Sequence, residues 1–305
     1  MGNRYRCAGT ASETYINGVM TNDRVDIKSF FLPFRCIENE ACFAELNNKI
    51  YIANLTDYPV TQSYIYTFDG SDFNRVAAFS WTLIRSMCSF NNTIYLCDEV
   101  NLFRLDGDTL TIITTIPEND GSYDYTLFSL GQYMYLLSCS VLDGYTNHLY
   151  RFTGSGWTEI DTISGKMKKP NCVLYNGAIH IMSDYLISQS VVIHKVFNGS
   201  TITDAPVQPY WMPRNAAYVF NNKLRGLIGR SGISSVQNGS AMDFDGNSWT
   251  VSDILSFDDN VNRERLLFDY YQAFTLKGKQ YLFNVMGSMM MEISNPIRLS
   301  QYFVS

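Results

Sequence analysis

The chain alternates between short apolar runs and polar turns along most of its length. The segments "NNKIYIANLT" (47–56), "NNTIYLCDEV" (91–100) and "NNKLRGLIGR" (221–230) are versions of one phrase, in which a tight polar turn leads into an apolar run. Short apolar runs bounded by such turns indicate β-strands. No α-helical periodicity of useful length accompanies them, so the pattern predicts an all-β fold.

The phrase recurs six times, and a second kind of turn recurs between its copies. The strand residues just after the first turn lie 40–56 residues apart, at Ile50, Ile94, Met134, Ile179, Leu224 and Gln280. The second turn stands at Asp69-Gly70, Asp106-Gly107, Thr153-Gly154, Asn198-Gly199 and Asp245-Gly246. Asn-Gly and Asp-Gly pairs supply the positive φ angles that tight hairpins need. Each unit therefore holds four short antiparallel strands, which at this period predicts a β-propeller blade.

The fifth unit carries a resemblance to a known repeat. The segment "PRNAAYVFNNKLRGLIG", followed by "FDGNSW", resembles the kelch repeat, and Trp157 and Trp249 hold its late tryptophan position. The Gly-Gly pair that usually ends the second kelch strand is replaced, for example by Ala53-Asn54. The resemblance covers about residues 41–303 and implies a single six-bladed, kelch-like β-propeller with four-stranded antiparallel blades.

The front of the chain is expected to close the ring. We divide the chain into an N-terminal arm, 1–40, and a propeller, 41–305. The segment "NDRVDIKSFFLPF" (22–34) resembles the fourth strand "FNRVAAFSWTL" (73–83), whereas the sixth unit lacks the turn before its own fourth strand. Residues 23–32 should therefore pair near 288–294 and remove the open edge. Residues 295–305 would form a tail or an extra edge strand.

Composition narrows the class of partner. The net charge of −6 and the pI near 5.1 argue against nucleic acid, whose binders carry a basic face. No apolar run follows Met1 and none approaches transmembrane length, so we expect cytoplasmic synthesis without a signal peptide or membrane insertion. The seven cysteines include no C-x-x-C and mostly sit in apolar runs, which predicts buried free thiols.

The candidate chemistry is sparse. His180 and His194 lie on adjacent strands of the fourth unit and would face each other if the hairpin turned around Ile187. Both occupy packing positions of the repeat and no third ligand accompanies them, so we expect a buried structural pair that holds no metal. Some kelch-like propellers are copper oxidases with a Cys–Tyr cross-link, but nothing marks such a pair here. We predict no catalytic, cofactor-binding or metal-binding residues, and no cofactor.

Contact residues are expected in the longer connections, because propellers carry function in loops on their faces. Exposed aromatic and arginine side chains suit contacts with proteins or carbohydrates. The longer loops considered are 117–125 and 256–265, and the candidates in or near loops are Tyr123, Tyr125, Tyr210, Trp211, Arg263 and Arg265.

The fold alone does not settle function, since propellers host enzymes and scaffolds alike. Without a catalytic set, we read a non-enzymatic binding or structural module. Asn/Tyr-rich, Gly-Gly-poor propellers of this kind are similar to those of phage virion and tail proteins. That resemblance implies a component of a virion or tail appendage that contacts other structural proteins, or a host-surface glycan or protein. The alternatives are a cytosolic kelch-type interaction adaptor and a glycan-active enzyme on a propeller scaffold.

Overall fold

The structure is a computed structural model that describes most of the ring. The described residues are 15–16, 19–20, 27–31, 35–36, 40–56, 62–79, 83–119, 123–140, 146–165, 167, 170–183, 193–210, 212–228, 240–253, 271–285 and 289–293. All regular elements among them are β-strands, and within this part of the chain no helix is long and apolar enough to span a bilayer.

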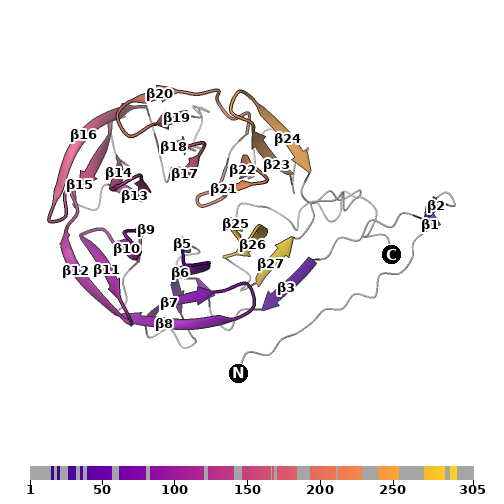
Figure 1. The fold of residues 1–305 in the computed structure, drawn as a ribbon, viewed down its shortest axis with the longest axis horizontal. Helices are drawn as coiled ribbons and strands as arrows, with labels where there is room; N and C mark the ends of the chain where they lie inside the picture. The colour runs from indigo at the N-terminus through magenta and orange to yellow at the C-terminus, as the bar shows by residue number, and fades with distance from the viewer. Residues whose placement is uncertain are drawn as a thin grey trace.

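Six antiparallel sheets stand in a ring, and the first strand of each lies nearest the ring axis (Figure 1). The prediction of an all-β, six-bladed propeller with four-stranded blades is therefore confirmed. Blade 1 is β5 (Cys42–Leu46), β6 (Lys49–Thr56), β7 (Ser63–Phe68) and β8 (Phe73–Phe79), and β4 (Arg35–Cys36) pairs with the end of β6. Blade 2 is β9 (Ser86–Phe90), β10 (Thr93–Cys97), β11 (Asn101–Asp106) and β12 (Thr109–Thr115).

The remaining blades follow in chain order. Blade 3 is β13 (Tyr123–Leu130), β14 (Tyr133–Ser140), β15 (Thr146–Phe152) and β16 (Trp157–Ser164). Blade 4 is β17 (Asn171–Tyr175), β18 (Ala178–Ser183), β19 (Ile193–Phe197) and β20 (Ile202–Asp204). Blade 5 is β21 (Ala217–Phe220), β22 (Lys223–Leu227), β23 (Ser240–Phe244) and β24 (Trp249–Asp253). Blade 6 is β25 (Tyr271–Leu276), β26 (Lys279–Asn284), β27 (Met289–Ile293) and β3 (Ile27–Phe31). A separate hairpin joins β1 (Tyr15–Ile16) to β2 (Val19–Met20).

Both recurring turns are hairpins, as the sequence predicts. The first is a two-residue loop, and at Asn47 and Asn48 both φ angles are positive, 53° and 57°. This geometry matches the twist of the flanking strands and suits asparagine. In the second turn of blade 1, the Asp69 carboxylate accepts the backbone N–H groups of Ser71 and Asp72, each at 2.9 Å. These bonds favour the charged form and lower the pKa of Asp69 to about 2.

The N-terminal strand closes the ring, which confirms that prediction, and its described residues are Ile27–Phe31. Strand β3 pairs antiparallel with β27, with Phe31 opposite Met289 and Ile27 opposite Ile293. Blade 6 is thus assembled from two distant parts of the chain, β3 from its beginning and β25–β27 from its end (Figure 1). The pairing covers an edge of β27 that would otherwise present open backbone groups.

Apolar contacts join neighbouring blades on the side of the ring where the hairpins turn. Four interfaces repeat one arrangement, in which a tyrosine on the second strand of one blade shares a hydrophobic cluster with an apolar residue of the next. The pairs are Tyr51 with Ile94, Tyr95 with Met134, Tyr135 with Ile179, and Tyr281 with Ile50. Buried aromatic and aliphatic surface of this kind is the main favourable term in folding.

Hydrogen bonds join the blades at the opposite end of the first strands. At least one bond crosses each of the six interfaces at this end, and we call the set formed by one such bond from each interface the inter-blade belt. Its residues are Asn54 with Ile84, Ser86 with Leu127, Thr126 with Pro170, Asn171 with Ala216, Asn215 with Ala273, and Gln272 with Ala41. The donor–acceptor distances range from 2.8 Å for Asn54 and Ile84 to 3.3 Å for Thr126 and Pro170. The belt satisfies backbone groups that would otherwise be buried without partners.

Deletion of residues 1–34 should leave the edge of β27 open. We expect the deleted protein to aggregate and to unfold at a lower temperature, because strand edges pair with other chains when they are not covered. A matched deletion of residues 1–22 keeps β3 and should behave like the full chain. Light scattering and a thermal melt report both properties. Equal solubility and equal melting temperature for all three proteins would show that β3 is dispensable.

Candidate functional site

The two faces of the ring differ in the kind of connection they carry. Since strands alternate in direction within a blade, the two recurring hairpins lie on one face, which we call the short-turn face. Connections between the second and third strands, and from one blade to the next, lie on the other, the long-connection face. Segments 205–216 and 254–270 both leave and rejoin the ring there. The inter-blade belt and the starts of the first strands lie at this face.

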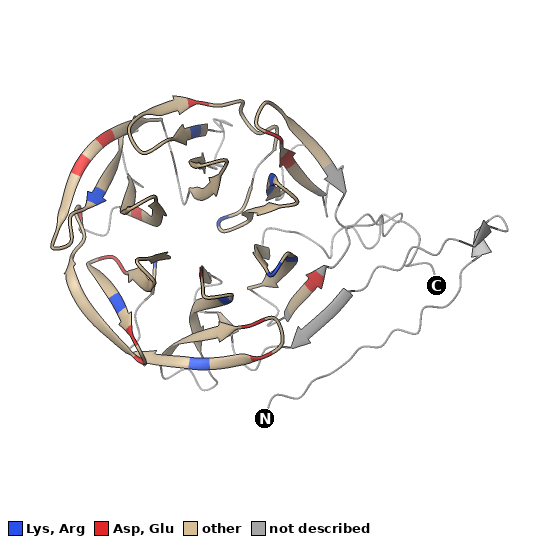
Figure 2. Cartoon of the chain, viewed as in Figure 1, with Lys and Arg blue, Asp and Glu red and all other residues tan. Residues whose placement is uncertain are grey.

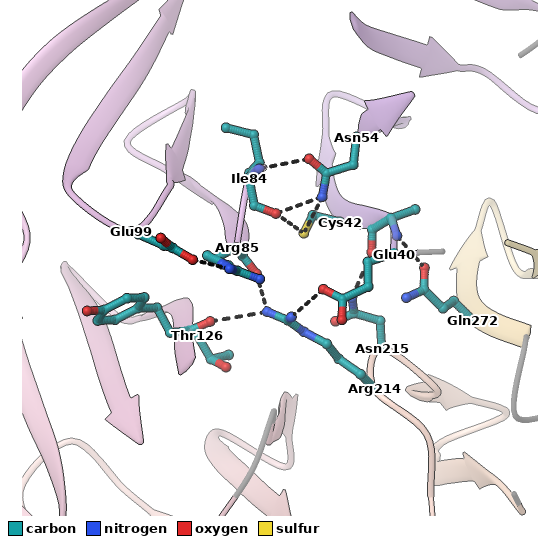
Figure 3. Close-up of polar contacts among 12 residues, drawn as sticks. Glu40, Cys42, Asn54, Ile84, Arg85, Glu99, Thr126, Arg214, Asn215 and Gln272 are labelled. Atoms are coloured by element: carbon teal, nitrogen blue, oxygen red, sulfur yellow. Dashed lines mark hydrogen bonds and ion pairs between the residues drawn. The ribbon is translucent and has the colours of Figure 1, made fainter. Parts of the chain in front are cut away.

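Arg214 connects four blades near the axis of the ring on the long-connection face (Figure 3). It precedes β21, and its guanidinium donates to a Glu40 carboxylate oxygen at 2.9 Å. It also donates to the backbone oxygens of Arg85, ahead of β9, and of Tyr125, on β13, the latter at 3.3 Å. The Arg214 side chain is 9% exposed and that of Glu40 15%. One side chain thus links blade 5 to blades 1, 2 and 3.

A second direct link joins blade 5 to blade 1. The Asn215 side-chain amide donates to the Ala41 carbonyl at 2.8 Å, beside the Arg214–Glu40 ion pair. Around the same axis, the Asn54 side chain both donates to the Ile84 carbonyl and accepts the Ile84 N–H, at 2.7 and 2.8 Å (Figure 3). The polar centre is therefore held by direct hydrogen bonds between blades, of which those of Asn54 with Ile84 are reciprocal.

Arg85 lies between this buried polar centre and solvent. Its guanidinium pairs with the Glu99 carboxylate, whose side chain is 46% exposed. Arg85 and Glu99 therefore offer both signs of charge at the border of the buried centre. Figure 2 shows acidic and basic positions interspersed around the described part of the ring.

A cluster of carboxylates around one imidazole lies on blade 3. The two ring nitrogens of His148 lie 3.3 Å from a Glu118 oxygen and 3.0 Å from a Glu159 oxygen. Glu118 also accepts the Ser138 hydroxyl at 2.6 Å, and its own φ angle is positive, 55°. Burial and the neighbouring Glu118 raise the pKa of the Tyr150 hydroxyl. Glu118 thus interacts with His148, Ser138 and Tyr150, so the cluster is an organised, partly exposed polar surface.

The two histidines of blade 4 form a buried pair, as expected. Their exposed fractions are 6% for His180 and 2% for His194, and His180 Nδ1 lies 2.8 Å from His194 Nε2. His194 is opposite Met182 and not opposite His180, so the two are diagonal neighbours, and the direct pairing expected for a turn around Ile187 is not found. The residue that stands opposite His194 is therefore shifted by two, from His180 to Met182.

The tautomers of this pair follow from their partners. His194 Nδ1 lies 2.8 Å from the Pro206 carbonyl oxygen, which can only accept, so this nitrogen carries the hydrogen. His194 Nε2 then accepts from Nδ1–H of His180. Trp249 of blade 5 donates its indole N–H to the same carbonyl at 2.8 Å. The pair therefore fixes the start of segment 205–216, which leads to Arg214.

Metal and thiol chemistry find little support in the described residues. No group of three or more His, Cys, Asp or Glu side chains within those ranges is placed to hold a metal ion. The six described cysteines are free and lie in buried or half-buried positions. Burial raises the pKa of the Cys88 thiol to about 12 and also raises that of Cys42. Thiols of this kind remain protonated and unreactive near neutral pH.

No family model and no curated protein matches the sequence. One solved structure similar to this chain is that of SapL1 lectin in complex with alpha methyl fucoside. The two are 11% identical, with a TM-score of 0.49, and the match covers 70% of this chain and 78% of that chain. At this level the likeness carries no argument about function, and the fold rests on the strand pairings described above.

The structure describes three of the six predicted contact residues. Arg263, Arg265 and Trp211 lie outside the described residues. Tyr210 is half-buried and packs against the core of blade 5, and Tyr123 is half-buried at the start of β13.

The prediction that Tyr125 is a contact residue in a loop is wrong. It is 0% exposed within β13, where its hydroxyl donates to the Glu118 carbonyl at 2.5 Å. That bond satisfies the hydroxyl and lets the ring be buried, so Tyr125 is not a surface contact. Segment 117–125 therefore supplies a shorter surface than expected, because β13 already begins at Tyr123.

Sequence reasoning missed Arg214 and Glu40, although a signal was present. When the blades are aligned on their first hairpins, both residues stand at the same distance before it, with opposite charge. Charged residues at equivalent places next to apolar strands predict polar contacts near the axis. The pairing of blade 5 with blade 1, however, follows from the geometry of the ring.

Removal of Arg214 should destabilise the ring through the carboxylate it leaves behind. We expect Arg214→Met to lower the free energy of unfolding by about 3 kcal/mol, since breaking a largely buried ion pair strands its partner. The double variant with Glu40→Gln should recover part of this loss. Denaturant titration of the four proteins measures the coupling. Arg104→Met removes the exposed pair with Asp106 and should cost less than about 1 kcal/mol. Additive effects of the Arg214 and Glu40 substitutions would contradict the assignment.

Acid should weaken the blade 4 histidine pair. Burial, then the neighbouring His194, lowers the pKa of His180 to about 4, and burial also lowers the pKa of His194. Below about pH 6.5 the two histidines therefore bind protons in the unfolded chain but remain neutral in the folded chain. The stability due to this pair is complete above that pH and is lost as the pH falls towards 4. His180→Tyr with His194→Leu should flatten the dependence of the unfolding free energy on pH between 6.5 and 4.5. An unchanged slope would show that the pair does not titrate as described.

Proposed function

We propose that the protein is a non-enzymatic binding module that contacts its partner through the long-connection face. The observation that carries this proposal is the difference between the two faces. The short-turn face consists of hairpin loops of two or a few residues, fixed by their own hydrogen bonds. The opposite face combines a hydrogen-bonded polar centre, Arg214 with Glu40, with the segments that join the blades.

This arrangement suits binding for a physical reason. Connections between blades can vary in sequence and length without disturbing the strand pairings, while the belt beneath them keeps their ends in place. Half-exposed charges such as Arg85 with Glu99, and Glu118 with His148, add polar groups that are already oriented. A surface ordered in advance loses little conformational freedom on binding.

As the finer proposal, the module is a component of a larger assembly, such as a virion or phage tail appendage. It would contact other structural proteins or a host surface. The support for this step is the similarity of the repeats to those of phage propellers. A partner-held interface should bury on the order of 1,000 Å² or more, with tyrosine and arginine enriched near its centre. Arg263 and Arg265, in the segment between β24 and β25, are the proposed contacts.

Charge reversal on this segment tests the proposal. The tagged protein is produced in its native source, and gradient sedimentation measures the fraction that travels with large particles. We expect the parent protein to sediment with particles and Arg263→Glu with Arg265→Glu to shift to the position of a free chain of 34.8 kDa. The melting temperature should hardly change, because exposed charges contribute little to folding.

The matched control reverses two exposed charges on the short-turn face, Lys49→Glu with Lys223→Glu, at the first residue after two hairpins. These should sediment like the parent. If both pairs behave alike, the long-connection face has no special role. If the parent never travels with particles, the assembly role fails. Hydrolysis or oxidation of a glycan by the purified chain would contradict the non-enzymatic assignment.

A further inference from the structure

The segment that joins blade 4 to blade 5 carries a short proline motif. Residues 205–210 read "APVQPY", so Pro206 and Pro209 stand three positions apart. Each proline fixes its own φ at about −65° and holds the residue before it in an extended conformation. No residue of 205–210 has a positive φ angle, and none belongs to a strand. These constraints favour the polyproline II conformation, which has no internal hydrogen bonds and repeats every three residues.

Burial along this segment follows the three-residue repeat. Gln208 is 1% exposed, and Ala205, three residues before it, is half-buried. Pro206 and Pro209 are both exposed, and Val207 between them is 56% exposed. One edge of the segment therefore faces the protein, while Pro206, Val207 and Pro209 form an apolar ridge directed at solvent. We call these three residues the proline ridge.

Hydrogen bonds to blades 4 and 5 hold the proline ridge in place. The Pro206 carbonyl accepts Nδ1–H of His194 and the indole N–H of Trp249, each at 2.8 Å. The Gln208 side-chain nitrogen donates to the Ser183 carbonyl at 3.3 Å. Because polyproline II leaves its own carbonyls without internal partners, surrounding side chains bind them without altering the conformation. The ridge is therefore ordered in advance, and a partner that binds it loses little conformational freedom.

The segment is also anchored beyond the ridge. Met212 is 1% exposed, and it packs over Gly226 of blade 5 so closely that a Cβ there would collide with its Cε and Sδ. Blades 2 and 3 carry Leu96 and Leu136 at the position of Gly226, so Met212 supplies the apolar side chain that blade 5 lacks. Both ends of the ridge are thus attached to packed parts of the ring.

The surroundings of the ridge extend its apolar surface and add one carboxylate. Val251 lies two residues after Trp249 on the regularly paired β24, hence on the same side of that strand, and is 41% exposed. At the start of the segment Asp204 pairs with Lys195 at 2.5 Å, and the Asp204 side chain is 85% exposed. A partner at this place meets saturated rings and methyl groups with a negative charge at one end.

We propose that the proline ridge docks into an aromatic-lined groove on a protein partner. Prolines at i and i+3 of a polyproline II segment lie about 9 Å apart on one side, which suits insertion between tyrosine and tryptophan rings. The three ridge residues supply saturated rings and methyl groups, so the aromatic side chains belong to the partner. Asp204 complements a basic side chain at the end of that groove. The inference rests on the proposed function, because the ridge lies on the long-connection face, and it names the chemistry of the partner's surface.

Removal of the ridge side chains tests the proposal. Particles are isolated from a source that lacks this protein, the purified full chain is added over a concentration series, and gradient sedimentation separates bound from free chain. Pro206→Ala with Pro209→Ala removes both rings and keeps the Pro206 carbonyl. We expect the concentration for half-maximal binding to rise on the order of tenfold, as for residues at the centre of an interface. A thermal melt checks the fold, and Val207→Ser, which keeps both prolines, decides the matter if the double variant melts early.

Ile112→Ser is the matched control. Ile112 is 61% exposed on β12 of blade 2, so the substitution removes a similar exposed aliphatic side chain away from the ridge. This variant should bind particles like the parent. Parent-like binding by the folded ridge variants overturns this inference alone and leaves the proposed function standing. A parent chain that does not bind particles contradicts the assembly role and this inference together.

Photo-crosslinking identifies the chemistry of the occupant. A benzophenone amino acid replaces Val207 in the full chain, the mixture with particles is irradiated, and mass spectrometry locates the attachment site. We expect attachment within a protein segment that contains two or more Tyr, Trp or Phe residues, and the same amino acid in place of Ile112 should not reach that segment. No attachment from position 207, or attachment to a glycan, a lipid or a segment without aromatic residues, overturns the proposal.

Discussion

The pairing of β3 with β27 is the contact on which the rest of the ring depends. A propeller blade buries both faces only when a blade stands on each side of it, so the last blade must meet the first. Here one sheet contains strands from the front and the end of the chain, and each of its hydrogen bonds also holds the ring closed. Such a closure joins residues far apart in sequence, and its entropic cost is recovered only when all six interfaces form.

The interfaces between blades are apolar at one end of the strands and hydrogen-bonded at the other. Aromatic and aliphatic contacts such as Tyr95 with Met134 supply non-directional burial near the hairpins, and the inter-blade belt supplies directional bonds near the opposite face. The apolar end fixes the distance between blades, and the polar end fixes their orientation. Arg214 extends the belt across the axis, so that hydrogen bonds link four blades at the centre of the long-connection face.

The candidate residues show where reading the sequence succeeds and where it fails. His180 and His194 were recognised as packing residues because they occupy Tyr and aliphatic positions of the repeat, and both are buried. Which residue stands opposite His194 was not predicted correctly, because this register depends on the length of the hairpin between the two strands. Tyr125 was assigned to a loop because an aromatic beside polar residues resembles a surface position, whereas the Glu118 carbonyl satisfies its hydroxyl inside the fold.

The sequence by itself determined the number of blades, the hairpins and the closing strand, because these depend on local turn chemistry and on a period repeated along the chain. Asn47 and Asn48 adopt positive φ for reasons that lie within the hairpin itself. Tertiary structure alone decided that Arg214 meets Glu40 and that Arg225 meets Gln280. Those contacts join residues of different blades, and which side chains meet depends on the closure and curvature of the whole ring, which no local pattern records.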